Sequence, residues 1–352
     1  MAGHARESAR NAVMLNIRRL MMPSGLDGRG YMLLAAMLML TICLLRPQAV
    51  LPVRVADWFI VLDITQSMNV RDYKVQGKQT SRLESAKLGI REGIRSLPCG
   101  SRVALGLFTE RATLSITRPL EVCRHYSALE QIVSSMDWRN AWAADSFITH
   151  GLYGAIGQTA RLGENVGLLF ITDGHQAPPA NPRYMPAFDG KPGAVKGVIM
   201  GSGKTTMSPI PKLDDRNEIS EYWTSEEVMR YGNFGMAETL SVLAMEQGQH
   251  DRNAGHGPGN DLLSTAHLSR LEEGNLQRLS GLTGLQYARM DNLHAIGKAM
   301  LDRTMGVWRP ALTDLRPWLA FPALLLTLLF FLPPAWTGRM MKIFYLLTKR
   351  RT

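Results

Sequence analysis

The sequence has few cysteines, few aromatic residues and no charge excess over most of its length. Only three of its 352 residues are cysteine, and 7% are aromatic. The net charge of +10 belongs to the ends, because residues 1–30 carry five Arg and residues 337–352 carry five Lys and Arg. Residues 47–336 carry 29 Lys and Arg against 28 Asp and Glu. A nearly neutral body lacks the basic surface of a nucleic-acid groove, so nucleic acid is not an expected partner.

Common nucleotide-binding and catalytic signatures are also missing. Residues 201–206 (GSGKTT) resemble a phosphate loop, but Val198 stands where that loop requires its first glycine. Pro209 and Pro211 follow where the loop needs a helix, and without that helix no N-terminal dipole holds phosphate. No dinucleotide-binding glycine pattern is present, and the spacing supports no Ser-His-Asp or Cys-His arrangement. We therefore expect a protein that is not an enzyme.

What the chain does have is an uncharged apolar segment beside each basic end. Residues 31–45 (YMLLAAMLMLTICLL) are 15 residues long, close to a signal-peptide core, and residues 317–336 have the 20 residues of a full span. No clear cleavage site follows the first segment, which favours an anchor. The positive-inside rule then predicts five regions. These are a cytoplasmic basic arm at 1–30, a transmembrane anchor at 31–50, a domain at 53–310 in the periplasm of a bacterial inner membrane, a transmembrane helix at 315–336 and a cytoplasmic basic tail at 337–352.

Two of the three cysteines are spaced as a disulfide across a hairpin. Residues 102–109 and 112–117 predict two strands joined by a tight turn at 110–111. Cys99 and Cys123 are equidistant from position 111, so an antiparallel hairpin would bring them opposite each other. An oxidising compartment would allow that bridge to form. The sequence predicts a Cys99–Cys123 disulfide, and two unrelated buried thiols are the alternative.

Short apolar runs alternate with amphipathic patterns over most of the body. This alternation predicts an α/β fold, a doubly wound and mostly parallel sheet with one antiparallel edge hairpin. Residues 202–272 are rich in Gly, Pro and polar residues and interrupt the alternation as a large insertion, with a helix near 236–246 and a loop at 253–260. The remaining elements are expected as strands at 58–62, 166–172, 195–201 and 286–290 and helices at 81–97, 126–136, 150–162, 275–282 and 293–301.

Hydroxyl and carboxylate oxygens follow two of the buried strands. Asp63 ends the first run, with Thr65 and Ser67 at alternating positions after it, and Asp173 ends the run at 166–172. Both carboxylates should lie at one sheet edge, where they would repel unless a cation sits between them. Oxygen ligands favour Mg²⁺, with Mn²⁺ or Ca²⁺ as alternatives, over zinc. The competing interpretation is a strand-end Asp that caps a turn.

These motifs resemble a known family. Residues 63–67 (DITQS) look like the D-x-S-x-S signature of von Willebrand factor A (VWA) domains, and residues 171–174 (ITDG) look like their second Asp motif. The resemblance covers about 57–304 and implies a VWA, Rossmann-like fold with a metal-ion-dependent adhesion site. Asp63, Thr65 and Ser67 would then be ligands, and Asp173 would act directly or through water.

The resemblance leaves the loop ligand open. The family normally has a Thr there, and Ser146 is the best match, with Asp145 as the other choice. Ser146 could instead be a helix N-cap. The protein-supplied oxygens would leave one coordination position of the metal open, and an acidic side chain of a partner protein would fill it.

A narrower resemblance concerns the biological setting. Ser67 and Met68 followed by Asp72, between two apolar anchors, are similar to bacterial membrane VWA proteins associated with MoxR-type AAA+ ATPases. Residues 97–100 (LPCG), 172–179 (TDGHQAPP) and 208–214 (SPIPKLD) resemble the branch encoded beside periplasmic methanol dehydrogenase. That resemblance implies an accessory factor in maturation of the quinoprotein, including its calcium insertion.

Two other functions are compatible with the same residues. One is a general MoxR-associated membrane-complex or envelope-stress subunit, or a structural subunit of a membrane complex whose metal site is degenerate and empty. The other is a metal-dependent hydrolase that uses Asp63 and Asp173. A hydrolase needs a general base near the metal, and only His175 is available for that role.

Overall fold

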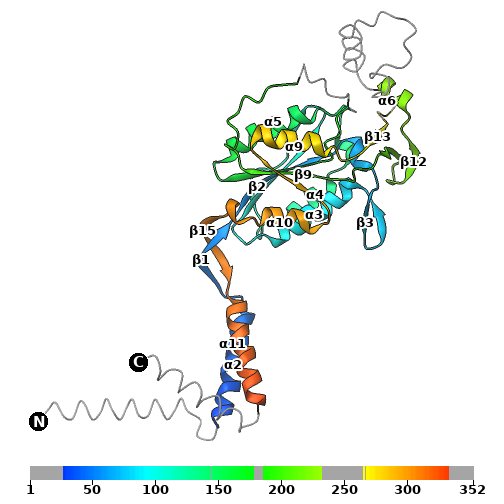
Figure 1. Cartoon of the computed structure of the whole chain (residues 1–352). Coiled ribbons are helices and arrows are strands. Elements are labelled where there is room, and N and C mark those ends of the chain that lie inside the picture. The colour runs from blue at the N-terminus through cyan, green and yellow to red at the C-terminus, as the bar shows by residue number, and fades with distance from the viewer. Residues whose placement is uncertain (1–26, 144, 178–184, 232–264, 266, 333–352) are drawn as a thin grey trace, which may run out of the picture. The chain divides into compact units, whose positions relative to one another are not determined.

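The computed structural model describes residues 27–143, 145–177, 185–231, 265 and 267–332 of the chain. It divides into two compact units, one of Pro52–Ala311 and one that combines Met1–Leu51 with Leu312–Thr352. The larger unit contains the predicted sheet and helices (Figure 1).

A seven-stranded sheet forms the centre of the larger unit, with the order β14-β9-β8-β2-β5-β6 and with β7 also paired to β5. β14, β9, β8, β2 and β5 are parallel, whereas β6 and β7 run antiparallel to β5. The predicted parallel sheet with an antiparallel edge hairpin is confirmed. The strands are β2 (Asp57–Asp63), β5 (Arg102–Thr109), β6 (Ala112–Ser115), β7 (Leu120–Glu121), β8 (Val166–Thr172), β9 (Gly197–Gly201) and β14 (Gln286–Arg289).

Helices cover both faces of this sheet (Figure 1). Along β2, Trp58, Ile60 and Leu62 pack into one core with α3, α4 and α10, while Phe59 and Val61 pack into a second core with α5 and α9. A strand buried on both faces is apolar at successive positions, which explains the unbroken run before Asp63. The helices are α3 (Arg82–Ser96), α4 (Tyr126–Ser135), α5 (Ile148–Leu162), α9 (Glu273–Thr283) and α10 (His294–Met300), close to their predicted ranges.

The predicted insertion at 202–272 contains short paired elements. β10 pairs with β13, which brings the two ends of the insertion together, and β11 pairs with β12. The predicted helix at 236–246 and the loop at 253–260 lie outside the described residues. The elements are β10 (Ser208–Pro209), β11 (Pro211–Leu213), β12 (Ile219–Tyr222), α6 (Ser225–Tyr231) and β13 (Leu268–Ser269).

Short elements complete the larger unit. β3 and β4 form a small hairpin directly before α3. The 3₁₀ turn η1 follows β2 and carries Ser67. The bounds are β3 (Tyr73–Val75), β4 (Lys78–Thr80), η1 (Gln66–Asn69), η2 (Trp138–Asn140) and η4 (Arg303–Met305).

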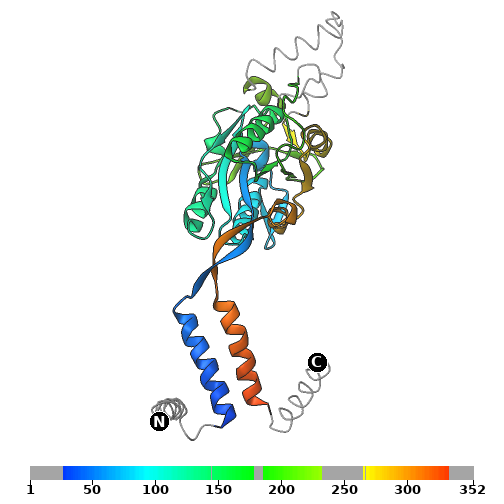
Figure 2. The same ribbon diagram turned by 90° about the vertical axis from the view of Figure 1, so that its left-hand side faces the viewer.

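The smaller unit consists mainly of two helices, α2 (Gly28–Leu44) and α11 (Arg316–Phe331), which lie side by side in both views (Figures 1 and 2). β1 (Gln48–Val55) pairs with β15 (Val307–Asp314) in a separate two-stranded sheet. α2 has 17 residues and α11 has 16, whereas a span needs about 20. Over the described ranges, no helix is both long and apolar enough to cross a membrane. The transmembrane helices predicted at 31–50 and 315–336 are therefore not supported.

Candidate metal site at the carboxyl end of the sheet

The strand order reverses between β2 and β8, which are neighbours in the sheet. From β2 the chain continues outward through β5, and from β8 it continues outward in the other direction through β9. In doubly wound sheets, ligands bind outside the carboxyl ends of the strands at this topological switch point. Asp63 is the last residue of β2, and Asp173 directly follows β8. Both predicted carboxylates therefore lie at the position where such folds bind ligands.

Asp63 is fully buried and is held by neutral hydrogen-bond donors. The backbone N–H and the hydroxyl of Thr65 donate to Asp63 Oδ1, at 2.9 and 2.7 Å. The hydroxyl of Thr172 donates to Asp63 Oδ2 at 2.6 Å. The Ser67 hydroxyl lies 3.3 Å from that of Thr65, because η1 turns the chain back toward the strand end. Asp63, Thr65 and Ser67 thus come together as the spacing predicts.

Burial and a neighbouring negative charge dominate the electrostatics of Asp63. Burial raises its pKa, and the neighbouring Asp173 carboxylate raises it further, to about 7. The hydrogen bonds from Thr172 and Thr65 lower the pKa but do not outweigh these effects. A cation beside Asp63 would stabilise the charged carboxylate, and a divalent ion would do so most strongly.

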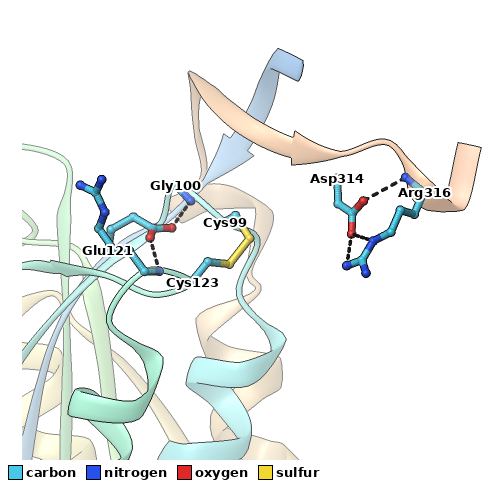
Figure 3. Close-up of a disulfide and its surroundings, with 7 residues drawn as sticks. Cys99, Gly100, Glu121, Cys123, Asp314 and Arg316 are labelled. Carbon is cyan, nitrogen blue, oxygen red and sulfur yellow. Dashed lines mark hydrogen bonds and ion pairs between the residues drawn. A yellow bond between two sulfur atoms is a disulfide. The ribbon is translucent and has the colours of Figure 1, made fainter. Parts of the chain in front are cut away.

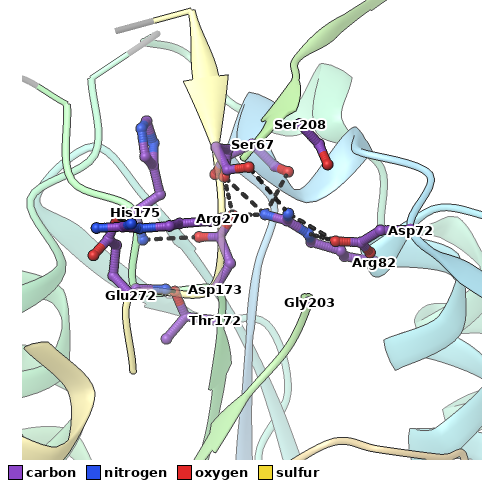
Figure 4. A network of polar contacts seen from close by, with 12 residues as sticks. Ser67, Asp72, Arg82, Thr172, Asp173, His175, Gly203, Ser208, Arg270 and Glu272 are labelled. Carbon is purple, nitrogen blue, oxygen red and sulfur yellow. Dashed lines mark hydrogen bonds and ion pairs between the residues drawn. The ribbon is translucent and has the colours of Figure 1, made fainter. Parts of the chain in front are cut away.

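Asp173 differs from Asp63, because it has a cationic partner that the sequence analysis did not identify. Arg82, the first residue of α3, is fully buried, and its Nη1 donates to Asp173 Oδ2 at 2.7 Å. Its Nε and Nη2 lie 2.9 and 2.8 Å from Asp72 Oδ2, on the other side of the guanidinium (Figure 4). Burial acts to lower the pKa of Arg82, but Asp173 and Asp72 more than offset this, so the pKa is raised.

One signal in the sequence pointed to Arg82. A positive charge in the first turn of a helix is unfavourable, because the helix dipole is positive there. The Ser81 hydroxyl accepts the N–H of Glu84 and caps the helix, which fixes Arg82 in that first turn. A basic residue at such a position, beside the buried Leu83, indicates an acidic partner elsewhere in the fold.

The loop that precedes α5 places Ser146 at the same end of the sheet. The Ser146 N–H donates to the carbonyl oxygen of Ala177 at 2.6 Å, and Ala177 N–H donates back at 3.1 Å. The Ser146 hydroxyl is buried and has no hydrogen-bond partner within the described part of the chain. Asp145 is also buried, and it already has an interaction partner. The orphaned hydroxyl makes Ser146 the better candidate for the loop ligand.

These residues fit a divalent cation with oxygen ligands. Asp63 supplies a buried carboxylate beside a second carboxylate, and Ser67 and Ser146 supply hydroxyls with little other hydrogen bonding among the described residues. Asp173 has one oxygen bound by Arg82, while its Oδ1 accepts only the N–H of His175, at 3.0 Å, among the described contacts. The site therefore has the donors that Mg²⁺ prefers.

Cys99 and Cys123 form a disulfide with a Cα–Cα distance of 5.3 Å (Figure 3). Cys99 precedes β5 and Cys123 follows β7, whose pairing places Glu121 opposite Arg102. The Glu121 carboxylate accepts the N–H groups of Gly100 and Arg124, at 2.7 and 2.6 Å. Although Glu121 lies close to both cysteines, the bridge leaves no thiolate to bind a metal.

Five parallel strands wound outward from a switch point, with carboxylate and hydroxyl oxygens at that point, define a doubly wound α/β domain with a candidate cation site. Neither a family model nor a curated protein matches this sequence.

Several solved structures are similar to this chain. BatB from Bacteroides thetaiotaomicron is 20% identical, with a TM-score of 0.44 over 70% of this chain and 95% of that chain. An aerotolerance-related membrane protein from Bacteroides fragilis is 20% identical, with a TM-score of 0.42 over 70% of this chain and 96% of that chain. A von Willebrand factor type A protein from Catenulispora acidiphila is 10% identical, with a TM-score of 0.32 over 78% and 45% of the two chains. At TM-scores below 0.5 these likenesses do not define the fold, which is defined by the strand order.

Proposed function

We propose that this protein is a VWA-type interaction module that binds a divalent cation at Asp63 and is not an enzyme. The buried carboxylate of Asp63 at the switch point carries this proposal. Its hydrogen-bond donors are neutral, and the charged neighbour that most affects its pKa is another carboxylate, Asp173. Ionising Asp63 beside Asp173 costs the folded protein free energy that a bound cation would offset.

The proposed cation is Mg²⁺, with Mn²⁺ or Ca²⁺ as alternatives. Asp63, Thr65, Ser67 and Ser146 would hold it, and Asp173 would contribute directly or through water. These protein oxygens would leave a coordination position of the metal open for a further ligand. An acidic side chain of a partner protein would take that position, so that binding requires both the metal and the partner's carboxylate.

Thermal melts of the protein with and without Mg²⁺ test the metal site. At a Mg²⁺ concentration one hundred times its dissociation constant, we expect about 2.7 kcal/mol of stabilisation, reversed by EDTA. Asp63→Asn should abolish this response. Asp57→Asn, the same change at the opposite end of β2, should keep it, because Asp57 pairs with Arg309 away from the site. An equal Mg²⁺ response in wild type and Asp63→Asn would refute the site.

We further propose that the module acts on the periplasmic side of a bacterial inner membrane. The Cys99–Cys123 disulfide supports an oxidising compartment. The resemblance of residues 97–100, 172–179 and 208–214 supports a role in maturation of methanol dehydrogenase, with a MoxR-type ATPase as a further partner. Capture of purified methanol dehydrogenase that is lost in EDTA would support this role, and equal capture with and without EDTA would contradict it.

The proposed metal ligands are buried in this structure. Asp63 and Asp173 are inaccessible, and Ser67 and Ser146 are nearly so. A partner's carboxylate can therefore reach the metal only if neighbouring residues withdraw. Those neighbours include the ends of the insertion at 202–272.

A further inference from the structure

Arg82 connects the candidate metal site to the insertion. Its Nη1 donates both to Asp173 Oδ2 and to the Ser269 hydroxyl, each at 2.7 Å. Ser269, in β13 of the insertion, is fully buried, and its hydroxyl donates to Asp173 Oδ2 at 3.1 Å. Figure 4 shows Arg82 between Asp72 and Asp173.

The same acidic residues also hold the other end of the insertion. The N–H of Lys204 donates to Asp72 Oδ2 at 3.0 Å, and the N–H of Leu271 donates to the Lys204 carbonyl at 2.7 Å. The N–H of Glu272 donates to the Asp173 carbonyl at 2.9 Å. Both ends of the insertion thus meet at the two carboxylates that the guanidinium bridges.

Gly203 allows the chain to pass close to the guanidinium of Arg82. It has φ = +120°, and a Cβ there would lie 2.6 Å from Arg82 Nε. Glycine alone tolerates both this backbone conformation and this contact. The glycine-rich segment at 201–206 therefore accommodates a guanidinium in place of the phosphate that its sequence first suggests.

The guanidinium of Arg82 and a bound divalent cation would compete for the Asp173 carboxylate. Both are attracted to Asp173, and they repel each other across a buried site where charges interact strongly. Asp173 Oδ2 already accepts bonds from Arg82 and Ser269. A dication that draws Asp173 toward itself weakens those two bonds and, with them, the attachment of β13.

We infer that Arg82 is a positioning residue that couples metal binding to the attachment of the insertion. This inference rests on the proposed function and adds regulation to the same site. Metal binding loosens the Ser269 end of the insertion. Because coupling between two sites is reciprocal, attachment of the insertion lowers the metal affinity by the same factor by which the metal weakens that attachment. Loosening at Ser269 also exposes the buried ligands to a partner.

Mg²⁺ titration calorimetry of the full-length protein tests the affinity side of this coupling. Arg82→Gln removes the competing charge, and we expect it to bind Mg²⁺ at least about fivefold more tightly than wild type. Arg91→Gln is the matched control, since Arg91 lies on the same helix and pairs with Glu130 at a half-exposed position. Its Mg²⁺ affinity should equal that of wild type.

Hydrogen exchange tests the structural side in the wild-type protein, so the result does not depend on the folding of a variant. Saturating Mg²⁺ should accelerate exchange of the Leu271 and Glu272 amides, whose acceptors are Lys204 and Asp173. In Arg82→Gln these amides should exchange fast already without Mg²⁺. Unchanged or slower exchange in wild type with Mg²⁺ bound would overturn the inference.

The outcomes separate this inference from the proposed function. Mg²⁺ binding that requires Asp63 but is not tightened by Arg82→Gln overturns the coupling and leaves the metal site standing. Absence of Mg²⁺ binding in both wild type and Arg82→Gln overturns both. Binding by Arg82→Gln alone supports the coupling, since the guanidinium then outcompetes the ion.

Discussion

At the scale of single residues, Asp63 makes the stability of the metal-free protein depend on pH. Its pKa is about 7 in the folded protein, above the ordinary value of 3.8. Between these values the folded state binds a proton that the unfolded state does not. The contribution of Asp63 to the free energy of unfolding should therefore be highest below pH 4, fall as pH rises toward 7, and level off above pH 7. The slope of this fall is at most about 1.4 kcal/mol per pH unit.

Urea denaturation in EDTA at several pH values between 4 and 8 measures this effect. Position 63 cannot ionise in Asp63→Asn, so the free energy of unfolding of this variant should not show the decrease with rising pH that Asp63 causes in wild type over this window. Mg²⁺ should remove most of this pH-dependent decrease in wild type, because the ion stabilises the charged carboxylate. Parallel pH curves for wild type and Asp63→Asn would show that Asp63 ionises normally.

The site residues differ in how far local sequence reveals them. Asp63 and Asp173 each end a continuous apolar run, and Thr65 and Ser67 follow at fixed spacing, so these positions could be predicted. The contact of Arg82 with the insertion could not, because Ser269 is 187 residues away in the chain. No periodicity or short motif encodes a contact of that separation.

At the scale of secondary-structure elements, the disulfide fixes the base of the hairpin arm formed by β5, β6 and β7. It closes a loop with a sequence separation of 24, which corresponds to about 3.5 kcal/mol of stabilisation in the chain-entropy estimate. The double variant Cys99→Ser/Cys123→Ser should lose about this much in urea denaturation. Wild type treated with a reductant should lose the same amount.

Cys43→Ser is the control for this experiment. Cys43 forms no disulfide and lies on α2 in the other unit, so its replacement should leave the midpoint of the larger unit unchanged. An unchanged midpoint in the double variant would mean that the bridge does not constrain the unfolded chain.

Elements with a strong apolar pattern were predicted well, and short paired elements were not. β5 and β8 have the predicted bounds, because each is buried along nearly its whole length. β10 and β13 have two residues each, and their pairing of Ser208 with Ser269 depends on the tertiary fold. The insertion could therefore be recognised by composition, while its attachment to the site could not.

At the scale of the whole molecule, the helix pair of the smaller unit has an unusual distribution of side chains. Its buried residues are small, Ala36 on α2 and Ala323 on α11. Many of its large apolar side chains are exposed, and Trp318 and Phe331 are 73% and 74% exposed. Small residues between helices and large apolar residues outside are typical of helices packed in lipid. We therefore expect this unit to associate with membranes.

Flotation of the full-length protein with phosphatidylglycerol-containing vesicles tests this expectation. Phe321 is 65% exposed on α11, so Phe321→Arg should retain the helix pair but weaken vesicle binding at least about tenfold, since the side chain no longer gains from burial. Leu114→Arg, on β6 of the larger unit, replaces a 46% exposed apolar residue and should bind vesicles as wild type does. Equal flotation of wild type and Phe321→Arg would contradict the assignment. Equal losses for both variants would instead show a general effect of added charge, because only one of the two substitutions lies on the helix pair.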